Sequence, residues 1–200
     1  IEEGGLLLNK VEADRLINIH WKNGKMTTDL LAQDIDVIIE RVGLRQRASE
    51  DTKFLILPTN KAGPSEVVCG EKMSRFLTLY KVKNFSKAIE LAIKIQDYQG
   101  AGHSLGIHTQ NKDRAHKIAM SAKTCRVIVN QAHCFATGGF FNNGLPFSLS
   151  MGCGSWGGNS IDGNLNWEHF VNKVRVVQTI AENKPDLEEI FGDYWGETSQ

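Results

Sequence analysis

Hydrophobic residues recur at helical spacing through most of the first fifty positions. One helix is predicted over 9–24, because Asn9 and Glu12 match a capping box and Gly24 follows the apolar stripe as a stop signal. A second helix is predicted over 28–42, where apolar residues recur every three or four positions and a glycine comes next. The short apolar run 53–57 is closed by proline and is typical of a buried strand.

The middle of the chain alternates between the two periodicities. Strands are predicted at 75–82, 103–109 and 126–129. Amphipathic helices fall between them, at 85–99 and 111–123, and each follows an asparagine that can cap it. A β-α-β-α-β succession implies parallel strands with right-handed crossovers. The expected fold class is therefore α/β, a mostly parallel sheet with flanking helices.

The pattern breaks after residue 130. Residues 131–166 are rich in Gly, Asn, Ser and aromatic side chains, which is typical of a long functional loop region. Residues 170–180 (FVNKVRVVQTI) are β-rich and are expected to form an edge strand that seeks a partner chain. The acidic tail 181–200 has Ile190, Phe191, Tyr194 and Trp195 at roughly helical spacing, so it is expected either to extend into solvent or to dock on another surface.

Composition narrows the function classes. The 200 residues include 23 Lys+Arg and 23 Asp+Glu, and this zero net charge disfavours a nucleic-acid binder. No apolar run reaches the ~18 residues that a membrane helix needs. Four widely spaced cysteines are expected to be reduced, as in a cytoplasmic protein. Residue 1 is Ile, so we expect the chain to begin partway through a longer product.

The most unusual stretch is Gly152-Cys153-Gly154-Ser155-Trp156-Gly157-Gly158. It contains G-x-G-x-x-G, but no apolar helix follows, so a dinucleotide-binding turn is rejected. The glycines are instead expected to allow positive φ angles and a close approach to a ligand or to another segment.

The cysteines also permit two other interpretations. Cys153 with His169, the sole later histidine, forms a possible nucleophile–base pair of a cysteine hydrolase. A zinc site from Cys125, His133 and Cys134 is disfavoured because no C-x-x-C pair is present, and no metal is expected. A packing loop remains the larger expectation for the segment around Cys153.

Two further features permit functional or structural readings. Glu66 and Glu71 precede the strand at Arg75, where a carboxylate can accept hydrogen bonds from ribose hydroxyls or can simply be solvated. His103 follows a glycine-rich turn and opens a predicted strand, and spacing alone favours a structural role for it. The scattered cations Arg75, Lys81, Lys83 and Arg126 can suit an anionic substrate, although a solvated face is the simpler expectation.

Five blocks, in order, resemble the C-terminal half of CoA-acylating aldehyde dehydrogenases. They are SEVVCGEKMSRFLTLYKVKNFSKAIELA, YQGAGHSLGIHT, CRVIVN, SLSMGCGSWGGNS and NKVRVVQTI. The resemblance covers about 53–180 and is fainter over the first fifty residues. It is closest to the acetaldehyde, succinate-semialdehyde and sulfoacetaldehyde branch, and the ending EEIFGDYW leans toward the sulfoacetaldehyde type.

The resemblance implies chemistry that this chain carries only in part. In the family, a cysteine thiolate attacks an aldehyde, hydride passes to NAD or NADP, and coenzyme A takes the acyl group from the resulting thioester. The family's nucleotide-binding domain and its nucleophilic cysteine align before Ile1. Cys153 then becomes a motif residue, although it stays the runner-up nucleophile.

The resemblance also carries over individual site residues. Glu71 aligns with the family's glutamate that binds the nicotinamide ribose, which reverses the expectation from spacing alone. Arg75 stands where the family usually has proline. Asn130 ends the V-x-V-N strand on the active-site side, and the backbone of 131–141 is implied to border the acyl pocket.

Three hypotheses follow. The first is an NAD(P)-dependent CoA-acylating aldehyde dehydrogenase, represented by its catalytic-domain portion at 1–169 and by an oligomerisation strand with an acidic tail at 170–200. It would act on a small aldehyde as a homo-oligomer in the cytoplasm, without nucleic-acid or membrane partners. The others are a cysteine hydrolase using Cys153 and His169, and a non-catalytic oligomerisation module.

Overall fold

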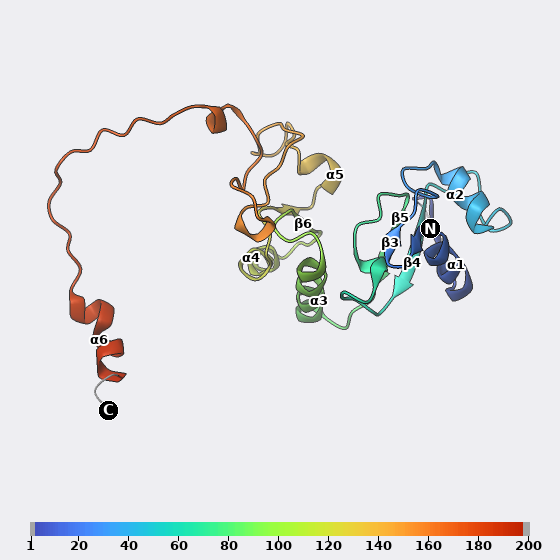
Figure 1. The fold of residues 1–200 in the computed structure, drawn as a ribbon, viewed down its shortest axis with the longest axis horizontal. Coiled ribbons are helices and arrows are strands. Elements are labelled where there is room, and N and C mark those ends of the chain that lie inside the picture. The colour runs from blue at the N-terminus through green and yellow to red at the C-terminus, as the bar shows by residue number, and fades with distance from the viewer. Residues whose placement is uncertain (1–2, 198–200) are drawn as a thin grey trace. The chain divides into compact units, whose positions relative to one another are not determined.

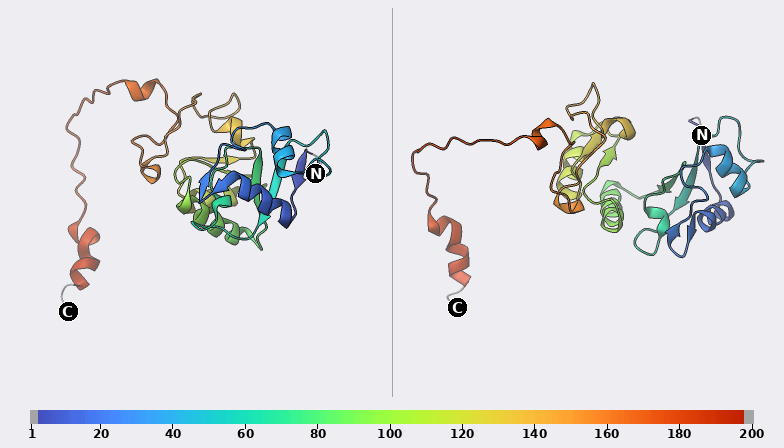
Figure 2. Two further views of the ribbon diagram at one scale, coloured as in Figure 1. Left: turned by 45° about the vertical axis from the view of Figure 1, so that its right-hand side comes forward. Right: turned by 45° about the horizontal axis from the view of Figure 1, so that its top comes forward.

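A computed structural model describes residues 3–197, and the chain divides into two compact units (Figures 1 and 2). The first unit is Ile1–Asn166 and holds two small parallel sheets with their helices. The second unit is Trp167–Gln200. Residues 198–200 of the predicted acidic tail lie outside the described residues.

The larger sheet is parallel and has the order β1 (Gly5–Leu7), β4 (Phe54–Thr59), β5 (Phe76–Tyr80). Its register places Leu6, Leu55 and Phe76 in one row, and this row faces the apolar core. Strand β4 confirms the predicted strand at 53–57, but it runs on through proline to Thr59. Strand β1 was not predicted, because three residues are too few to establish an alternating pattern.

Helix α1 (Lys10–His20) and helix α2 (Ile35–Val42) both contribute to this core. The capping box at the start of α1 is confirmed: the Asn9 side chain accepts from the Glu12 backbone N–H at 3.0 Å, and the Glu12 carboxylate accepts from the Asn9 N–H at 2.8 Å. These paired hydrogen bonds satisfy two of the donors that a helix start leaves open.

The predicted end of the first helix at Gly24 is wrong. The helix stops at His20, and β2 (Trp21–Lys22) pairs antiparallel with β3 (Lys25–Met26). Asn23 and Gly24 join these strands with φ angles of 53° and 73°. Asn-Gly readily adopts such left-handed turns, so it closes a hairpin here in place of ending a helix.

The predicted second helix is too long at its N-terminal end. Residues 28–34 form turns, and α2 begins only after Asp34. The Thr27 hydroxyl accepts from the Asp29 N–H, and Ala32 has a φ of 54° and donates its N–H to the Met73 carbonyl. A tertiary contact to another loop thus overrides the local helical pattern.

The smaller sheet is one β-α-β unit: β6 (Leu105–Ile107), helix α4 (Lys112–Ser121) and β7 (Val127–Val129). Helix α3 (Phe85–Tyr98) precedes it. The α/β fold class and the predicted β-α-β-α-β succession are confirmed as β5-α3-β6-α4-β7, but its strands do not share one sheet, because β5 pairs with β4 while β6 pairs with β7. The short strands also leave the predicted strand ends, 75, 81–82, 103–104, 108–109 and 126, outside the ladders.

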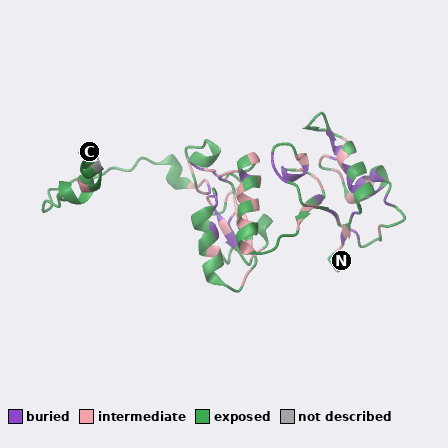
Figure 3. Ribbon diagram, turned by 90° about the horizontal axis from the view of Figure 1, so that it is seen from below, coloured by how far each residue is buried: buried purple, intermediate pink, exposed green. Residues whose placement is uncertain are grey.

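Residues 131–166 contain little regular structure, as predicted. They include the short helix α5 (His133–Ala136) and a 3-10 turn at Ser155–Gly157. In the second unit a 3-10 turn at Trp167–Phe170 leads to residues 171–186, which form neither helix nor strand and are exposed (Figure 3). The strand expected at 170–180 is therefore absent from the described chain taken by itself, where no neighbouring strand pairs with it.

The tail ends in helix α6 (Leu187–Glu197), so the helical spacing of its apolar residues is confirmed. The Phe191 and Trp195 rings lie 5.7 Å apart on this helix. The large apolar side chains of α6 stay substantially exposed, with 51% for Ile190 and 44% for Phe191. The helix thus carries an apolar face that the second unit does not cover.

Candidate functional site

The loop that carries Glu71 is anchored on both sides. The Glu71 backbone N–H donates to the Gln99 side-chain oxygen at 2.7 Å, and the Ser74 hydroxyl donates to the Leu30 carbonyl at 2.8 Å. The Glu71 side chain is exposed and, among the residues that the structure describes, has no ion pair or hydrogen bond. The backbone is held while the carboxylate stays available to a ligand.

His20 also anchors the loop that carries Glu71. Its Nε2 lies 2.9 Å from the Lys72 carbonyl, and its fully buried ring makes edge contacts with Trp21 and Phe76. Burial lowers the pKa of His20, so the neutral ring is favoured and Nε2 can donate to that carbonyl. Sequence reasoning gave His20 no role, because only the fold brings it to a loop fifty residues away.

Three titratable side chains lie near the Glu71 loop. Burial lowers the pKa of Lys72, whose ammonium donates to the Gly70 carbonyl at 2.7 Å. Burial and the nearby Cys69 and Glu66 raise the pKa of Tyr80 to about 12, and its buried hydroxyl has no hydrogen-bond partner among the described residues. The Arg75 guanidinium pairs with the Asp34 carboxylate at 3.0 Å.

The two glycine-rich motifs pack against each other. A Cβ on Gly102 would collide with the Cys153 carbonyl oxygen, and one on Gly157 would collide with the Cys153 Cβ. Gly102 and Gly154 also have φ angles of 85° and 58°, which favour glycine. A Cβ on Gly152 would likewise collide with the Ile161 carbonyl oxygen, so the predicted close approach is to other segments of the same chain.

Arg126 is at the centre of a buried polar network. Its guanidinium donates to the Gly152 carbonyl from both Nη atoms and to the His103 carbonyl from Nη1, each at 3.0 Å, while Nε donates to Asn164 Oδ1 at 2.8 Å. Asn164 in turn donates to the Thr137 and Pro146 carbonyls at 2.9 Å. The expectation of a solvated Arg126 is wrong, because its side chain is buried and binds the segment before β6 to the irregular loop.

Cys153 is half-buried, and its backbone N–H donates to Asn159 Oδ1 at 2.8 Å. His169, its predicted partner in the hydrolase hypothesis, belongs to the second unit. All four cysteines are free thiols, and burial raises the pKa of Cys125. Among residues 3–197, no three His, Cys, Asp or Glu side chains form a group suited to a metal ion.

His103 and His133 come together across Ser104. The Ser104 hydroxyl lies 2.7 Å from Nδ1 of His103 and 2.8 Å from Nε2 of His133. Burial and the charge of His103 lower the pKa of His133. Sequence reasoning did not pair these two histidines, because thirty residues separate them and no spacing rule links a strand start to α5.

Asn130 closes the end of the β6–β7 pair. Its side chain accepts from the Thr109 N–H at 2.7 Å and donates to the Thr109 carbonyl at 2.8 Å, and its own φ is 53°. Asn130 and the residues that follow it border a cavity of about 280 Å³. Its lining residues are Asn130, Gln131, Ala132, Phe135, Ala136, Phe140 and Asn142. The lining combines amide groups with two phenylalanine rings and has no charged side chain.

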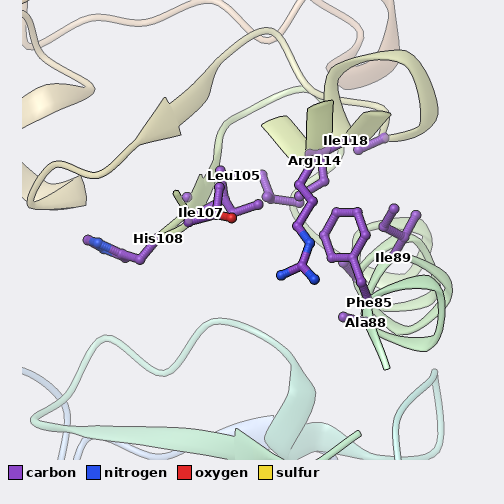
Figure 4. Close-up of a pocket in the computed structure, with 12 residues that line it drawn as sticks. Phe85, Ala88, Ile89, Leu105, Ile107, His108, Arg114 and Ile118 are labelled. Atoms are coloured by element: carbon purple, nitrogen blue, oxygen red, sulfur yellow. The ribbon is translucent and has the colours of Figure 1, made fainter. Parts of the chain in front are cut away.

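A separate cavity of about 360 Å³ lies between α3, β6 and α4 (Figure 4). Its lining is mostly apolar, and the Arg114 guanidinium sits 5.1 Å from the centre of the Phe85 ring. No site residue predicted from the sequence lines this cavity.

No helix in the described part of the chain is both long and apolar enough to cross a membrane.

The sequence of this chain is similar to those of known dehydrogenases. The chain is 42% identical over 192 residues to the acylating sulfoacetaldehyde dehydrogenase of Cupriavidus necator, covering 96% of this chain and 39% of that protein. It is 34% identical over 194 residues to the acetylating succinate-semialdehyde dehydrogenase of Clostridium kluyveri, covering 96% of this chain and 42% of that one.

The fold agrees with these relatives. The crystal structure of an acetylating aldehyde dehydrogenase from Geobacillus thermoglucosidasius superposes with a TM-score of 0.81 at 28% identity, covering 92% of this chain and 40% of that one. No family model matches the chain. The chain spans about two fifths of the length of these relatives. Over nearly all of its length, its predicted resemblance to CoA-acylating aldehyde dehydrogenases is confirmed.

Proposed function

We propose that this chain is the catalytic-domain portion of an NAD(P)-dependent, CoA-acylating aldehyde dehydrogenase. The observation that carries the proposal is the 42% identity to an acylating sulfoacetaldehyde dehydrogenase over 96% of the chain. The reaction joins an aldehyde and coenzyme A into a thioester while two electrons leave as hydride. The cytoplasm is the proposed compartment, which agrees with the four free thiols.

Glu71 is the proposed contact to the nicotinamide nucleotide. Its loop is fixed by the Gln99 and His20 hydrogen bonds, while its exposed carboxylate can accept hydrogen bonds from ribose hydroxyls. These features fit a nucleotide ribose. When bound, the nucleotide would supply the hydride acceptor, and Glu71 would hold and orient it. Glu71→Gln is expected to raise the KM for the nucleotide about tenfold, with a smaller change in kcat.

The nucleophilic cysteine is proposed to lie upstream of Ile1, and none of Cys69, Cys125, Cys134 and Cys153 is assigned that role. The test measures aldehyde- and CoA-dependent NADH formation by the 200-residue chain and by the natural protein, whose intact mass is determined in parallel. We expect turnover only from a longer polypeptide. Robust turnover by the 200 residues alone would place the nucleophile within them, and a natural protein inactive on every aldehyde tested would contradict the proposed activity.

The second unit is proposed to pair with another subunit. Val174, Val176 and Val177 are 85–92% exposed, and a β-rich apolar segment in water favours a partner strand. Size measurement with and without residues 170–200 tests this proposal. An unchanged oligomeric state would contradict it.

A further inference from the structure

Residues 71–74, which include Glu71, are each held by a hydrogen bond to another part of the chain. Their partners are, in order, the Gln99 side chain, the His20 ring, the Ala32 N–H and the Leu30 carbonyl. Amide and main-chain groups keep one protonation state between pH 5 and 8, whereas an imidazole can change its own in this range. His20 is therefore the anchor in this set that can respond to pH.

The surroundings of the His20 ring favour a single protonation state. The residue is 0% exposed, and its ring contacts those of Trp21 and Phe76 at centroid distances of 4.5 and 5.0 Å. The Lys72 carbonyl, 2.9 Å from Nε2, can only accept, so Nε2 carries the proton of the neutral ring. Nδ1 is buried and has no hydrogen-bond partner in the described part of the chain. A second proton, on Nδ1, would make a buried cation with an unsatisfied donor, which is costly.

The charged groups near the ring also disfavour this second proton. Burial and, beside it, the Lys72 ammonium lower the pKa of His20. Strands β4 and β5 bring no charged side chain, and the acidic residues of α1 lie in its first half. The two carboxylates of the turns at 28–34 are paired with cations: Asp29 with Lys22 and Arg41, and Asp34 with Arg75.

Water has to reach the ring before a proton on it can be stabilised. Helix α1, strand β5 and the loop 70–75 all contribute to the surroundings of the ring. The loop forms neither helix nor strand, so its displacement breaks fewer backbone hydrogen bonds than displacement of either regular element. The loop is therefore the segment that should move when His20 is protonated.

We propose that His20 is a positioning residue that makes nucleotide binding at Glu71 depend on pH: the neutral ring holds the loop 70–75 in place, and a protonated ring releases it. This inference rests on the proposed function, because it concerns the same Glu71 site. A fully buried ring cannot touch the nucleotide, so His20 acts on Glu71 through the Lys72 carbonyl. Nucleotide affinity should be highest when His20 is neutral and should fall as the pH drops.

The first test measures the loop in the 200-residue chain without nucleotide. NMR relaxation of the backbone amides reports the motion of residues 71–74, and the ring resonances report the protonation of His20. As the pH falls from 7.5 to 5, we expect these residues to become mobile as His20 is protonated, while the amides of β4 stay protected from exchange. A loop that stays ordered throughout this range overturns the inference. Equal opening of β4 also overturns it, because the whole core would then be unfolding.

Two substitutions at His20 separate its hydrogen bond from its charge. His20→Gln keeps an N–H donor but cannot be protonated in this range, so the loop should stay ordered at every pH. His20→Met fills the space without a donor, so the loop should be mobile at every pH. His116→Gln, the same substitution at an exposed histidine, should behave as the natural sequence does. Loop motion in His20→Gln that follows the natural pH dependence overturns the inference, even if His20→Met does not fold.

Kinetics of the natural enzyme connect the loop to the nucleotide. At pH 7.5, His20→Met should raise the KM for NAD or NADP about fivefold, the effect of one hydrogen bond, with little change in kcat. The KM of the unsubstituted enzyme should approach this value as the pH falls to 5, and His20→Gln should keep the low KM throughout.

The kinetic outcomes distinguish this inference from the proposed function. The same pH dependence of KM in the unsubstituted and His20→Gln enzymes contradicts the inference and leaves the activity in place. Absence of turnover with every aldehyde contradicts the proposed function, while the NMR measurements still decide whether His20 controls the loop.

Discussion

The two parallel sheets of the first unit are stabilised by different means. The β1-β4-β5 sheet and its helices share a core of thirteen buried apolar residues, all between Leu8 and Phe76. Beyond residue 84, the buried apolar side chains are only Ile118, Ala122, Ile128 and Ala136 among the described residues, and they are joined by buried Arg126 and Asn164. One region is held by apolar packing, and the other by hydrogen bonds and glycine contacts.

The difference accounts for where irregular backbone is tolerated. Apolar packing is nondirectional and suits regular elements, whereas a guanidinium and an amide can satisfy carbonyls that point in arbitrary directions. The long loop 131–166 keeps its shape because Arg126 and Asn164 bind its carbonyls. The stability of this region is therefore sensitive to single substitutions, because loss of one side chain leaves several buried acceptors without a partner.

The largest expected effect is that of Arg126→Met. It leaves the Gly152 and His103 carbonyls and Asn164 Oδ1 without their donor, and about 3–5 kcal/mol of stability should be lost. Hydrogen exchange should show residues 131–166 opening while residues 3–80 stay protected. Arg45→Met, an exposed control, should change stability by less than about 0.5 kcal/mol. Uniform loss of protection in both regions would contradict the division.

Leu16→Ala addresses the apolar region. Leu16 is fully buried in the core, so its truncation should cost about 2–5 kcal/mol in the free energy of unfolding. Val11→Ala, on the exposed side of the same helix, is the control. Protection from hydrogen exchange should fall at residues 3–80. It should stay unchanged at residues 131–166, which the Arg126 network holds. If the loop 131–166 loses protection first, the two regions are not independently stabilised.

Gly102→Ala tests the glycine contact. The new Cβ would meet the Cys153 carbonyl at a positive φ, and we expect a loss of about 1–3 kcal/mol together with displacement of the loop at 152–158. Gly163→Ala lies in the same irregular region with nothing near the added methyl group, and should be close to neutral. Comparable thermal shifts for the two variants would show that the close packing contributes little.

The smallest expected effect is a pH dependence that comes from His20. Because burial lowers its pKa in the folded chain, its contribution to stability is complete above the unfolded value of about 6.5 and is lost as pH falls from there through the folded pKa. Thermal unfolding between pH 7.5 and 5 measures this loss. His20→Met should flatten the slope, even though it lowers stability at every pH. The exposed control His116→Asn should retain the slope.

Local signals predicted the caps and the helices well. Asn84 and Asn111 both accept backbone N–H groups at the starts of α3 and α4, as their positions before apolar stripes indicated. The Asn23-Gly24 hairpin has an equally local signal. Because a helical apolar pattern precedes it, Gly24 was interpreted as the end of the helix and not as part of a turn. The helix predicted over residues 28–34 is wrong for a different reason. The hydrogen bond between Ala32 and Met73 joins segments about forty residues apart, which a local pattern does not reveal.

The candidate site was predictable only where a motif spans consecutive residues. Glu71 became a candidate only through the resemblance of its block and remains a prediction, whereas the glycines of 152–158 were correctly predicted as positions of close approach. The environment of Arg126 depends on carbonyls at 103 and 152, and the link between His103 and His133 depends on a serine placed by β6. Backbone acceptors and bridging hydroxyls leave no pattern in a single sequence, because every residue supplies the former and many supply the latter.

The Asn130 side chain ends the β6–β7 ladder by imitating one more residue of backbone. It supplies an acceptor and a donor to Thr109, as a neighbouring strand would, while its own main chain has already turned away. The last hydrogen bonds of the ladder therefore need no further residue of strand, and the main chain can turn toward the cavity directly after β7. One amide side chain thus sets the point at which regular strand gives way to the irregular loop.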